Sequence, residues 1–305
     1  MARGDSLSSP RPPIDVVCEL ITEGESPGLA RGRRETKTIE RCCLCRASLP
    51  GECASGGSTR NLRNMLSSAF RNPSKILIST VSTLVVIEAV RLIRLYRSVE
   101  GNKRYWYQRA SAPALPGDFI YLALGDSVAN AIGASRPQNG YVGLIERNIH
   151  EKTGRNVHVI NVSVTGATTD NVIREQLPKI RRWRPDLVTL DIGANDVNKN
   201  LPEVDFMRDF ATILDALPAG KTIVADLPTF VRGPKQSTLM RLNAAMHAQI
   251  AAHHFEVAPI FEVTSATIHD WRTYGADFFH PSNKGHRNWY RAFEAHVDAI
   301  VHGVK

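Results

Sequence analysis

Five residues from four separate parts of the sequence have the groups that nucleophilic acyl transfer requires. The hydroxyl of Ser127 can act as a nucleophile, and the imidazole of His280 is a base that can take its proton. Asp277, three residues before His280, can reach the imidazole, fix its tautomer and stabilise its charged form. The side-chain amide of Asn195 and the backbone N–H of Gly166 can donate hydrogen bonds to a developing oxyanion. Each residue alone is typical of a turn, so the chemistry depends on a fold that brings them together.

The pattern of the chain from Asp118 onward indicates such a fold, because short apolar runs alternate with helical patterns. Strands are predicted at 119–124, 157–162, 186–192, 222–226 and 256–260, and helices at 141–153, 170–183, 204–217, 237–253 and 284–301. Short buried strands that alternate with helices predict a parallel sheet covered by helices on both faces. Ligands of such sheets bind at the carboxyl ends of the strands. Ser127, Gly166 and Asn195 follow the first three predicted strands, and a helix after Ser127 would aim backbone N–H groups at the same place.

The segments around these residues read GDSVANAIGAS, NVSVTGATTDNV, DIGANDV and DFFHPSNKGH. In this order the set resembles the four motif blocks of the SGNH (GDSL) hydrolases, which contribute Ser, Gly, Asn and His. The resemblance covers the chain from about residue 118 to the end and says nothing about residues 1–110. It implies an α/β fold, a flavodoxin-like three-layer α/β/α sandwich with a five-stranded parallel sheet.

The resemblance also implies a role for each residue of the site. Ser127 would be the nucleophile, His280 the general base and Asp277 the residue that orients the base. The oxyanion hole would consist of the backbone N–H groups of Ser127 and Gly166 together with the side-chain amide of Asn195. Asp126 and Asp196 are interpreted as structural residues that accept hydrogen bonds from loop backbone.

We therefore expect a serine ester hydrolase that forms an acyl-enzyme on carboxylic esters. Its substrate would be a small-molecule or lipid ester, of the kind cleaved by esterases, lysophospholipases or short-chain acyl esterases. One alternative is an O-acetylesterase of carbohydrate or cell wall. An alternative of another class is a catalytically silent binding module, which the complete set of five residues argues against.

The distribution of charge argues against nucleic acid as a partner. The chain carries 38 Lys and Arg against 30 Asp and Glu, a net charge of +8. Residues 60–109 hold ten basic and two acidic residues, whereas positive and negative charges cancel in residues 1–59 and in residues 110–305. A nucleic-acid binder would carry its excess charge on the main domain.

The sequence predicts neither a cofactor nor a metal site. All five cysteines lie in the first 53 residues, and the pair Cys42 and Cys45 is followed by no second CxxC or His pair at zinc-finger spacing. No dinucleotide-binding or P-loop motif occurs. The predicted hydrolase domain lacks cysteine, so it has no disulfide framework.

An apolar run from 76 to 87, preceded by Arg71 and Lys75, has the layout of a signal peptide or signal anchor. Twelve helical residues span only about 18 Å, but extension to Tyr96 gives about 31 Å, close to the thickness of a bilayer core. An uncleaved membrane anchor through residues 76–96 is the first interpretation. A helix lying on the membrane surface and a buried helix of a soluble protein are the alternatives.

The chain is accordingly divided into four parts. Residues 1–64 are predicted to be a disordered or mis-assigned N-terminal extension, with Met65 as a more typical start. Residues 65–99 form the anchor helix, 100–117 a linker and 118–305 the SGNH hydrolase domain. We expect a membrane-anchored protein with an extracytoplasmic catalytic domain. Both flanks of the apolar run are basic, so the charges do not determine on which side of the membrane the domain lies.

Overall fold

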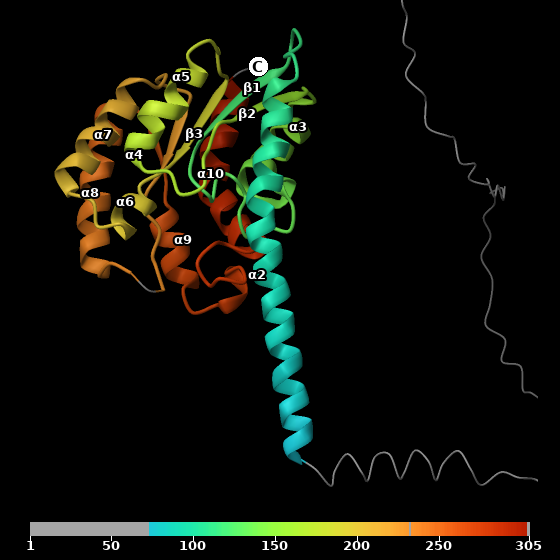
Figure 1. Ribbon diagram of the computed structural model, residues 1–305. Coiled ribbons are helices and arrows are strands. Elements are labelled where there is room, and N and C mark those ends of the chain that lie inside the picture. The colour runs from blue at the N-terminus through green and yellow to red at the C-terminus, as the bar shows by residue number, and fades with distance from the viewer. Residues whose placement is uncertain (1–72, 232, 304–305) are drawn as a thin grey trace, which may run out of the picture. The chain divides into compact units, whose positions relative to one another are not determined.

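A five-stranded parallel sheet forms the centre of the protein. The computed structural model describes residues 73–231 and 233–303 (Figure 1). The strands are β1 (Phe119–Gly125), β2 (Val157–Asn161), β3 (Leu187–Asp191), β4 (Thr222–Ala225) and β5 (Glu256–Ala258). They pair in the order β2-β1-β3-β4-β5 with every pair parallel, which is the flavodoxin-like order. The predicted fold class is therefore confirmed, and every predicted strand is present.

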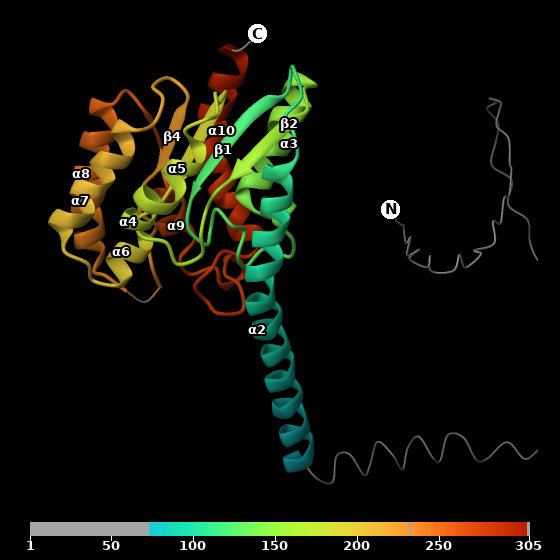
Figure 2. The same cartoon turned by 45° about the horizontal axis from the view of Figure 1, so that its top comes forward.

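Helices cover both faces of the sheet (Figures 1 and 2). One face is covered by α3 (Tyr141–Thr153), α9 (Ile260–Thr267) and α10 (Asn283–Gly303). The other is covered by α4 (Thr169–Asn171), α5 (Leu177–Ile180), α7 (Glu203–Asp215) and α8 (Gln236–Ala252). Shorter elements are α6 (Ala194–Asn198), η1 (Pro137–Asn139), η2 (Val172–Gln176) and η3 (Trp271–Thr273).

Strand β1 shows why a strand of this sheet can be apolar at consecutive positions. Successive side chains of a strand point to opposite faces. Phe119 and Tyr121 pack into the core beneath α3 and α10, whereas Leu122 and Leu124 pack into the core beneath α7 and α8. Because both faces are covered, neither set of positions is polar.

Two regions differ from the predicted helices. The helix expected at 170–183 is divided into α4, the π-helical turn η2 and α5, because Pro178 has no N–H to continue the α-helical hydrogen bonds. Helix α9 was not predicted, since its sequence, Ile-Phe-Glu-Val-Thr, resembles a strand, and Pro259 stands at its N-cap.

The long helix α2 (Pro73–Ser111) corrects the predicted linker at 100–117. The helix continues to Ser111 because Asn102 and Trp106 are buried against the domain that contains the sheet, and Arg109 forms an ion pair with Glu146. Only the six residues from 112 to 117 connect α2 to the domain.

The N-terminal part of α2 packs against no other element in the part of the chain that the structure describes, and every residue from 74 to 87 is exposed. Its length and composition would allow it to cross a membrane, and no other helix of the described ranges meets the same test. A helix buried in a soluble domain, the third interpretation above, is therefore wrong for this segment. The predictions for residues 1–64, for the cysteines and for the start at Met65 lie outside the described residues.

Candidate active site

The structure brings Ser127, His280 and Asp277 into one hydrogen-bonded chain. His280 Nε2 lies 3.0 Å from Ser127 Oγ, and His280 Nδ1 lies 2.5 Å from Asp277 Oδ2. Partial burial acts to raise the pKa of Asp277, but the hydrogen bond and charge of His280 outweigh it and hold that pKa below its usual value. The carboxylate is therefore ionised and can only accept, so Nδ1 carries the proton and Nε2 is left to accept from the Ser127 hydroxyl.

The backbone around Gly125 determines where Ser127 lies. Gly125 has φ of 150°, and a Cβ there would come within 2.4 Å of the Asp191 carbonyl oxygen on the neighbouring strand, so only glycine fits. The buried side chain of Gln176 binds both polar groups of Gly125: its oxygen accepts from the N–H at 3.0 Å and its amide donates to the carbonyl at 2.8 Å. This pair of bonds fixes the end of β1 two residues before Ser127.

Turns, and not the regular helix that we expected, follow Ser127. The Ile132 N–H donates to the Ser127 carbonyl, and the Asn130 N–H donates to the Asp126 carbonyl. The first helical segments after this stretch are η1 and α3.

The loop that carries His280 is held by its own carboxylate. Asp277 Oδ1 accepts from the backbone N–H groups of Phe279 at 3.1 Å and His280 at 3.0 Å. The base of the loop is closed by the Gly275 N–H, which donates to the His280 carbonyl at 2.7 Å. Asp277 therefore fixes both the backbone and the imidazole of His280.

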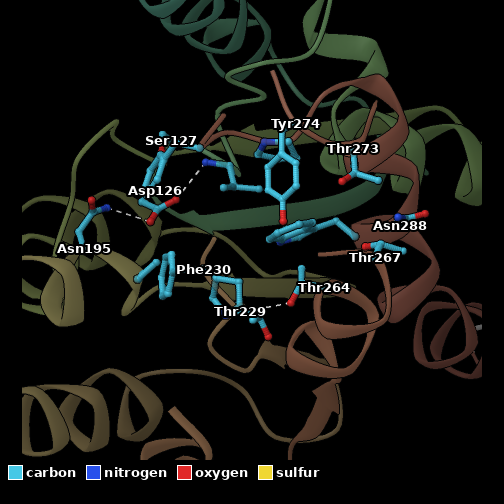
Figure 3. Close-up of a pocket in the computed structure, with 17 residues that line it drawn as sticks. Asp126, Ser127, Asn195, Thr229, Phe230, Thr264, Thr267, Thr273, Tyr274 and Asn288 are labelled. Carbon is cyan, nitrogen blue, oxygen red and sulfur yellow. Dashed lines mark hydrogen bonds between the residues drawn. The ribbon is translucent and has the colours of Figure 1, made fainter. Parts of the chain in front are cut away.

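Asn195 lies beside Ser127 but its amide is already engaged. Its Nδ2 donates to Asp126 Oδ2 at 2.9 Å and to the carbonyl of Ala167 at 3.0 Å (Figure 3). An amide nitrogen has two hydrogens, so both are in use. Another of the three predicted donors, Gly166, adopts φ of 80° in the turn next to Ala167, and its carbonyl accepts from Lys199 Nζ at 3.0 Å.

The carboxyl of Asp126 is the link between Ser127 and Asn195. It is buried, and its other oxygen accepts from the Val128 N–H at 3.0 Å. Burial raises its pKa to about 6, opposed by the Val128 hydrogen bond and the charge of His280. Asp196 has the structural role predicted for it, since it accepts from the backbone and hydroxyl of Thr169.

A pocket opens beside Ser127, with Asp126 and Asn195 at one end (Figure 3). Its volume is about 50 Å³. Gly166 does not line it. The walls are formed by apolar and hydroxyl side chains from several loops, among them Phe230, Thr264, Tyr274, Phe279 and Trp289.

Sequence reasoning missed two positions of the site, Gln176 behind Gly125 and Trp289 in the pocket wall. Gln176 falls within the helix predicted at 170–183, and no local signal marks a buried glutamine. Trp289 donates from Nε1 to Asp191 Oδ2 at 3.2 Å beneath the pocket. Burial, reinforced by the charge of Asp126, raises the pKa of Asp191 well above its usual value. Asp191 is the last residue of a strand that the sequence predicts to be buried, and a carboxyl group at such a position could have marked it as part of the site.

Across residues 73–231 and 233–303, no three His, Cys, Asp or Glu side chains are grouped so that they could hold a metal ion.

Comparison with known proteins gives one matching family model, the GDSL-like Lipase/Acylhydrolase family, over residues 123–287. Esterase TesA from Pseudomonas aeruginosa is 26% identical over 106 residues, which are 35% of this chain and 49% of that protein. The chain thus spans about half the length of this curated relative.

Solved structures share the fold. The crystal structure of TesA aligns with a TM-score of 0.50 at 18% identity and covers 59% of this chain and 99% of that one. LAE5, an alpha/beta hydrolase enzyme from the metagenome of Lake Arreo, Spain, aligns with a TM-score of 0.51 at 16% identity, covering 61% and 98%. EstA from Pseudoalteromonas sp. gives 0.50 at 17% identity, covering 61% and 100%.

Proposed function

The chain belongs to the GDSL-like lipase/acylhydrolase family, and from this premise we propose that it is a serine ester hydrolase that acts through an acyl-enzyme. The observation that carries the proposal is the continuous hydrogen-bonded chain from Ser127 through His280 to Asp277. The base lies within hydrogen-bonding distance of both the nucleophile and the residue that orients the base.

The reaction proceeds in two halves. Ser127 Oγ bonds to the ester carbonyl carbon while its proton passes to His280 Nε2, and Asp277 stabilises the imidazolium. His280 then gives the proton to the leaving alcohol as the ester C–O bond breaks, which leaves the acyl group on Ser127. In the second half a water molecule gives its proton to His280 and attacks the acyl carbon, and Ser127 leaves with the proton.

The proposed oxyanion hole consists of the N–H groups of Ser127 and Gly166 and the amide of Asn195. Because both hydrogens of that amide are engaged, one of them must turn from Asp126 or Ala167 toward the oxyanion. The exchange becomes favourable only when negative charge develops on the substrate oxygen, so the amide would act mainly in the transition state.

The small pocket supports a short acyl group. A volume of about 50 Å³ accommodates only a few heavy atoms, whereas pockets that enclose drug-sized ligands hold about 300–1,000 Å³. This observation also supports an O-acetylesterase as the second candidate. A panel of p-nitrophenyl esters from acetate to palmitate, tested on the full chain in detergent, separates the possibilities: we expect the acetate and butyrate esters to be cleaved fastest, and a preference for palmitate would contradict the short acyl group.

We further propose that the protein is membrane-anchored through the apolar part of α2, within residues 76–96, and that residues 118–305 are the hydrolase domain. The exposure of every side chain from 74 to 87 supports the anchor, because water would otherwise contact a long apolar surface. Leu95, near the end of this range, is buried against the domain. The full chain should stay in the membrane pellet after a carbonate wash, and its appearance in the supernatant would contradict the anchor.

From the signal-anchor pattern we propose that the hydrolase domain lies outside the cytoplasm. Protease added to intact cells should digest the hydrolase domain if the placement is right. Protection of the domain until the membrane is opened would place it on the other side.

A further inference from the structure

The direction of α2 determines which edge of the sheet is near its apolar part. Arg109 donates to the carbonyl of Val157, at the start of β2. One or two turns earlier, Asn102 donates to the carbonyls of Asn130 and Ala131, which follow the carboxyl end of β1. The helix therefore runs antiparallel to the strands, as Figures 1 and 2 show, and its earlier residues lie toward the edge that carries the active site.

The end of the apolar segment that is nearer to the domain lies close to the level of the His280 loop. Leu95 lines a groove together with Gly133 and Gly275, and Gly275 donates to the His280 carbonyl. Eight residues separate Leu95 from Ile87, the last residue of the apolar run, and they span about 12 Å of helix. The polar layer on each side of a bilayer core is about 5–8 Å thick. The run from 76 to 87 covers only about 18 Å, so a bilayer core of about 30 Å takes in further residues toward Tyr96. If α2 lies in a bilayer, the active-site edge of the domain therefore lies at the headgroup layer.

The groove between α2 and this edge is strongly basic. Its volume is about 590 Å³, and the cations that line it are Arg91, Arg94, Arg272, Lys284 and Arg287. No carboxylate of the described residues lines it. From its rim, Glu88 pairs with Arg91, and Asp270 pairs with both Arg272 and Lys284. Five cations against two carboxylates leave three positive charges for a ligand.

Exposed aromatic side chains lie on the same edge. Trp271 is 67% exposed, Phe278 58% and Phe279 46%. Phe279 also lines the pocket beside Ser127. Phe278 has φ of 52°, a backbone conformation that is unfavourable for a bulky residue. Aromatic side chains are enriched where proteins meet the headgroup layer of a membrane.

We propose that the hydrolase domain docks on the bilayer that holds α2, with the basic groove binding the phosphates of anionic phospholipids and Trp271 and Phe278 entering the headgroup layer. The proposal rests on the membrane anchoring proposed above. It places the mouth of the catalytic pocket on the lipid surface, so that a short acyl group esterified to a membrane lipid reaches Ser127 without leaving the bilayer.

The fluorescence of Trp271 tests the docking in the full chain. The chain has four tryptophans, so the signal of Trp271 is the difference between wild type and Trp271→Phe. The protein is placed in phosphatidylcholine vesicles with brominated acyl chains, with or without about 30% phosphatidylglycerol to give a negative surface. We expect the bromines to quench Trp271, and more strongly in the anionic vesicles. Trp183, which lies before β3 at the opposite edge of the sheet, is the matched control and should not be quenched.

A pair of charge substitutions tests the groove. Arg94 and Arg287 form no ion pair within the described part of the chain. Arg94→Gln with Arg287→Gln should lower the ratio of docked to undocked domain about 30-fold in anionic vesicles, since each basic residue near such a surface contributes about 1 kcal/mol. Arg182→Gln with Arg184→Gln removes the same charge from the opposite edge and should leave Trp271 quenching unchanged.

Flotation of the vesicles separates the two ways in which the experiment can fail. Protein that floats with the vesicles while Trp271 stays unquenched would overturn the docking and leave the anchor intact. Equal quenching in neutral and anionic vesicles would overturn the role of the basic groove. Protein that does not float would overturn the anchor and the docking together, and hydrolysis of p-nitrophenyl acetate would still report the proposed esterase independently.

Discussion

The groups on the two sides of Ser127, the base and the proposed oxyanion hole, differ in how much they must rearrange for the reaction. On the side of the base, His280 already accepts from Ser127 and donates to Asp277, and Asp277 also holds the backbone of the loop. On the side of the proposed oxyanion hole, the amide of Asn195 is bound to Asp126 and Ala167. The first side needs no rearrangement to take a proton, whereas the second must exchange a hydrogen bond when charge develops.

This difference predicts unequal consequences of mutation. A group that is in place before the substrate arrives contributes to every step in which it takes part. A donor that is released only in the transition state contributes to the rate constant and little to binding. Substitutions on the two sides should therefore separate by magnitude and by the kinetic parameter that they change.

The largest effects should come from the base side. His280→Ala removes the base and should lower kcat by about 10⁶, whereas Asp277→Asn keeps the base in the wrong tautomer and should lower kcat by about 10⁴. Steady-state hydrolysis of p-nitrophenyl acetate measures both, and His302→Ala on the exposed end of α10 is the control. A larger loss in Asp277→Asn than in His280→Ala would contradict the roles given to them.

A smaller effect is expected on the oxyanion side. Asn195→Ala should lower kcat by about 10²–10³ and leave KM nearly unchanged, because the amide is needed only when the oxyanion forms. Asn198→Ala, one turn later on α6 and outside the pocket lining, should retain wild-type kinetics. A rise in KM at constant kcat in Asn195→Ala would show that the amide binds substrate and not the transition state.

The buried carboxyl of Asp126 should give stability a distinctive pH dependence. Its pKa is about 6 in the folded protein against an ordinary value of 3.8. Because the folded state binds this proton more tightly, the stability that it contributes is present below pH 3.8 and is lost as the pH rises to about 6. Between pH 3 and pH 7 the wild type should lose about 3 kcal/mol relative to Asp126→Asn.

Urea denaturation at several pH values measures this difference, with Asp170→Asn on the exposed surface as the control. A constant difference between wild type and Asp126→Asn across this range would show that Asp126 has no raised pKa.

The smallest effect is expected for Gln176, whose hydrogen bonds to Gly125 fix the strand end that precedes Ser127. Gln176→Ala leaves the N–H and carbonyl of Gly125 without their partners and should lower the free energy of unfolding by about 2 kcal/mol. Activity should fall with stability only if the end of β1 shifts. Glu175→Ala, an exposed neighbour, should change neither, and equal effects of the two substitutions would remove the role given to Gln176.

Much of this architecture could be predicted from the sequence. The apolar runs of β1 to β5 and the periodicity of α3, α7, α8 and α10 depend on local burial, which a single sequence records. The π-helical turn η2 could not be predicted, because Pro178 interrupts the α-helical hydrogen bonds without determining which turn replaces them. Helix α9 could not be predicted, because its β-branched residues are typical of a strand.

The candidate site divides in the same way. The side chains of Ser127, His280 and Asp277 were predicted from their types and order, and the structure places them in contact. The engagement of the Asn195 amide by Asp126, and the hold of Gln176 on Gly125, depend on residues brought together from separate strands and loops. No pattern within one segment encodes such a contact.

Labelling of Ser127 tests the central claim most directly. A fluorophosphonate probe reacts only with an activated serine, so the full chain should gain one adduct, mapped by peptide mass spectrometry to Ser127. Ser237→Ala, on the exposed surface of α8, should label like the wild type, and Ser127→Ala should not label although it folds. Absence of the adduct from folded wild-type protein, or undiminished labelling of Ser127→Ala, would contradict a serine hydrolase acting through Ser127 and would favour a catalytically silent binding module or another nucleophile.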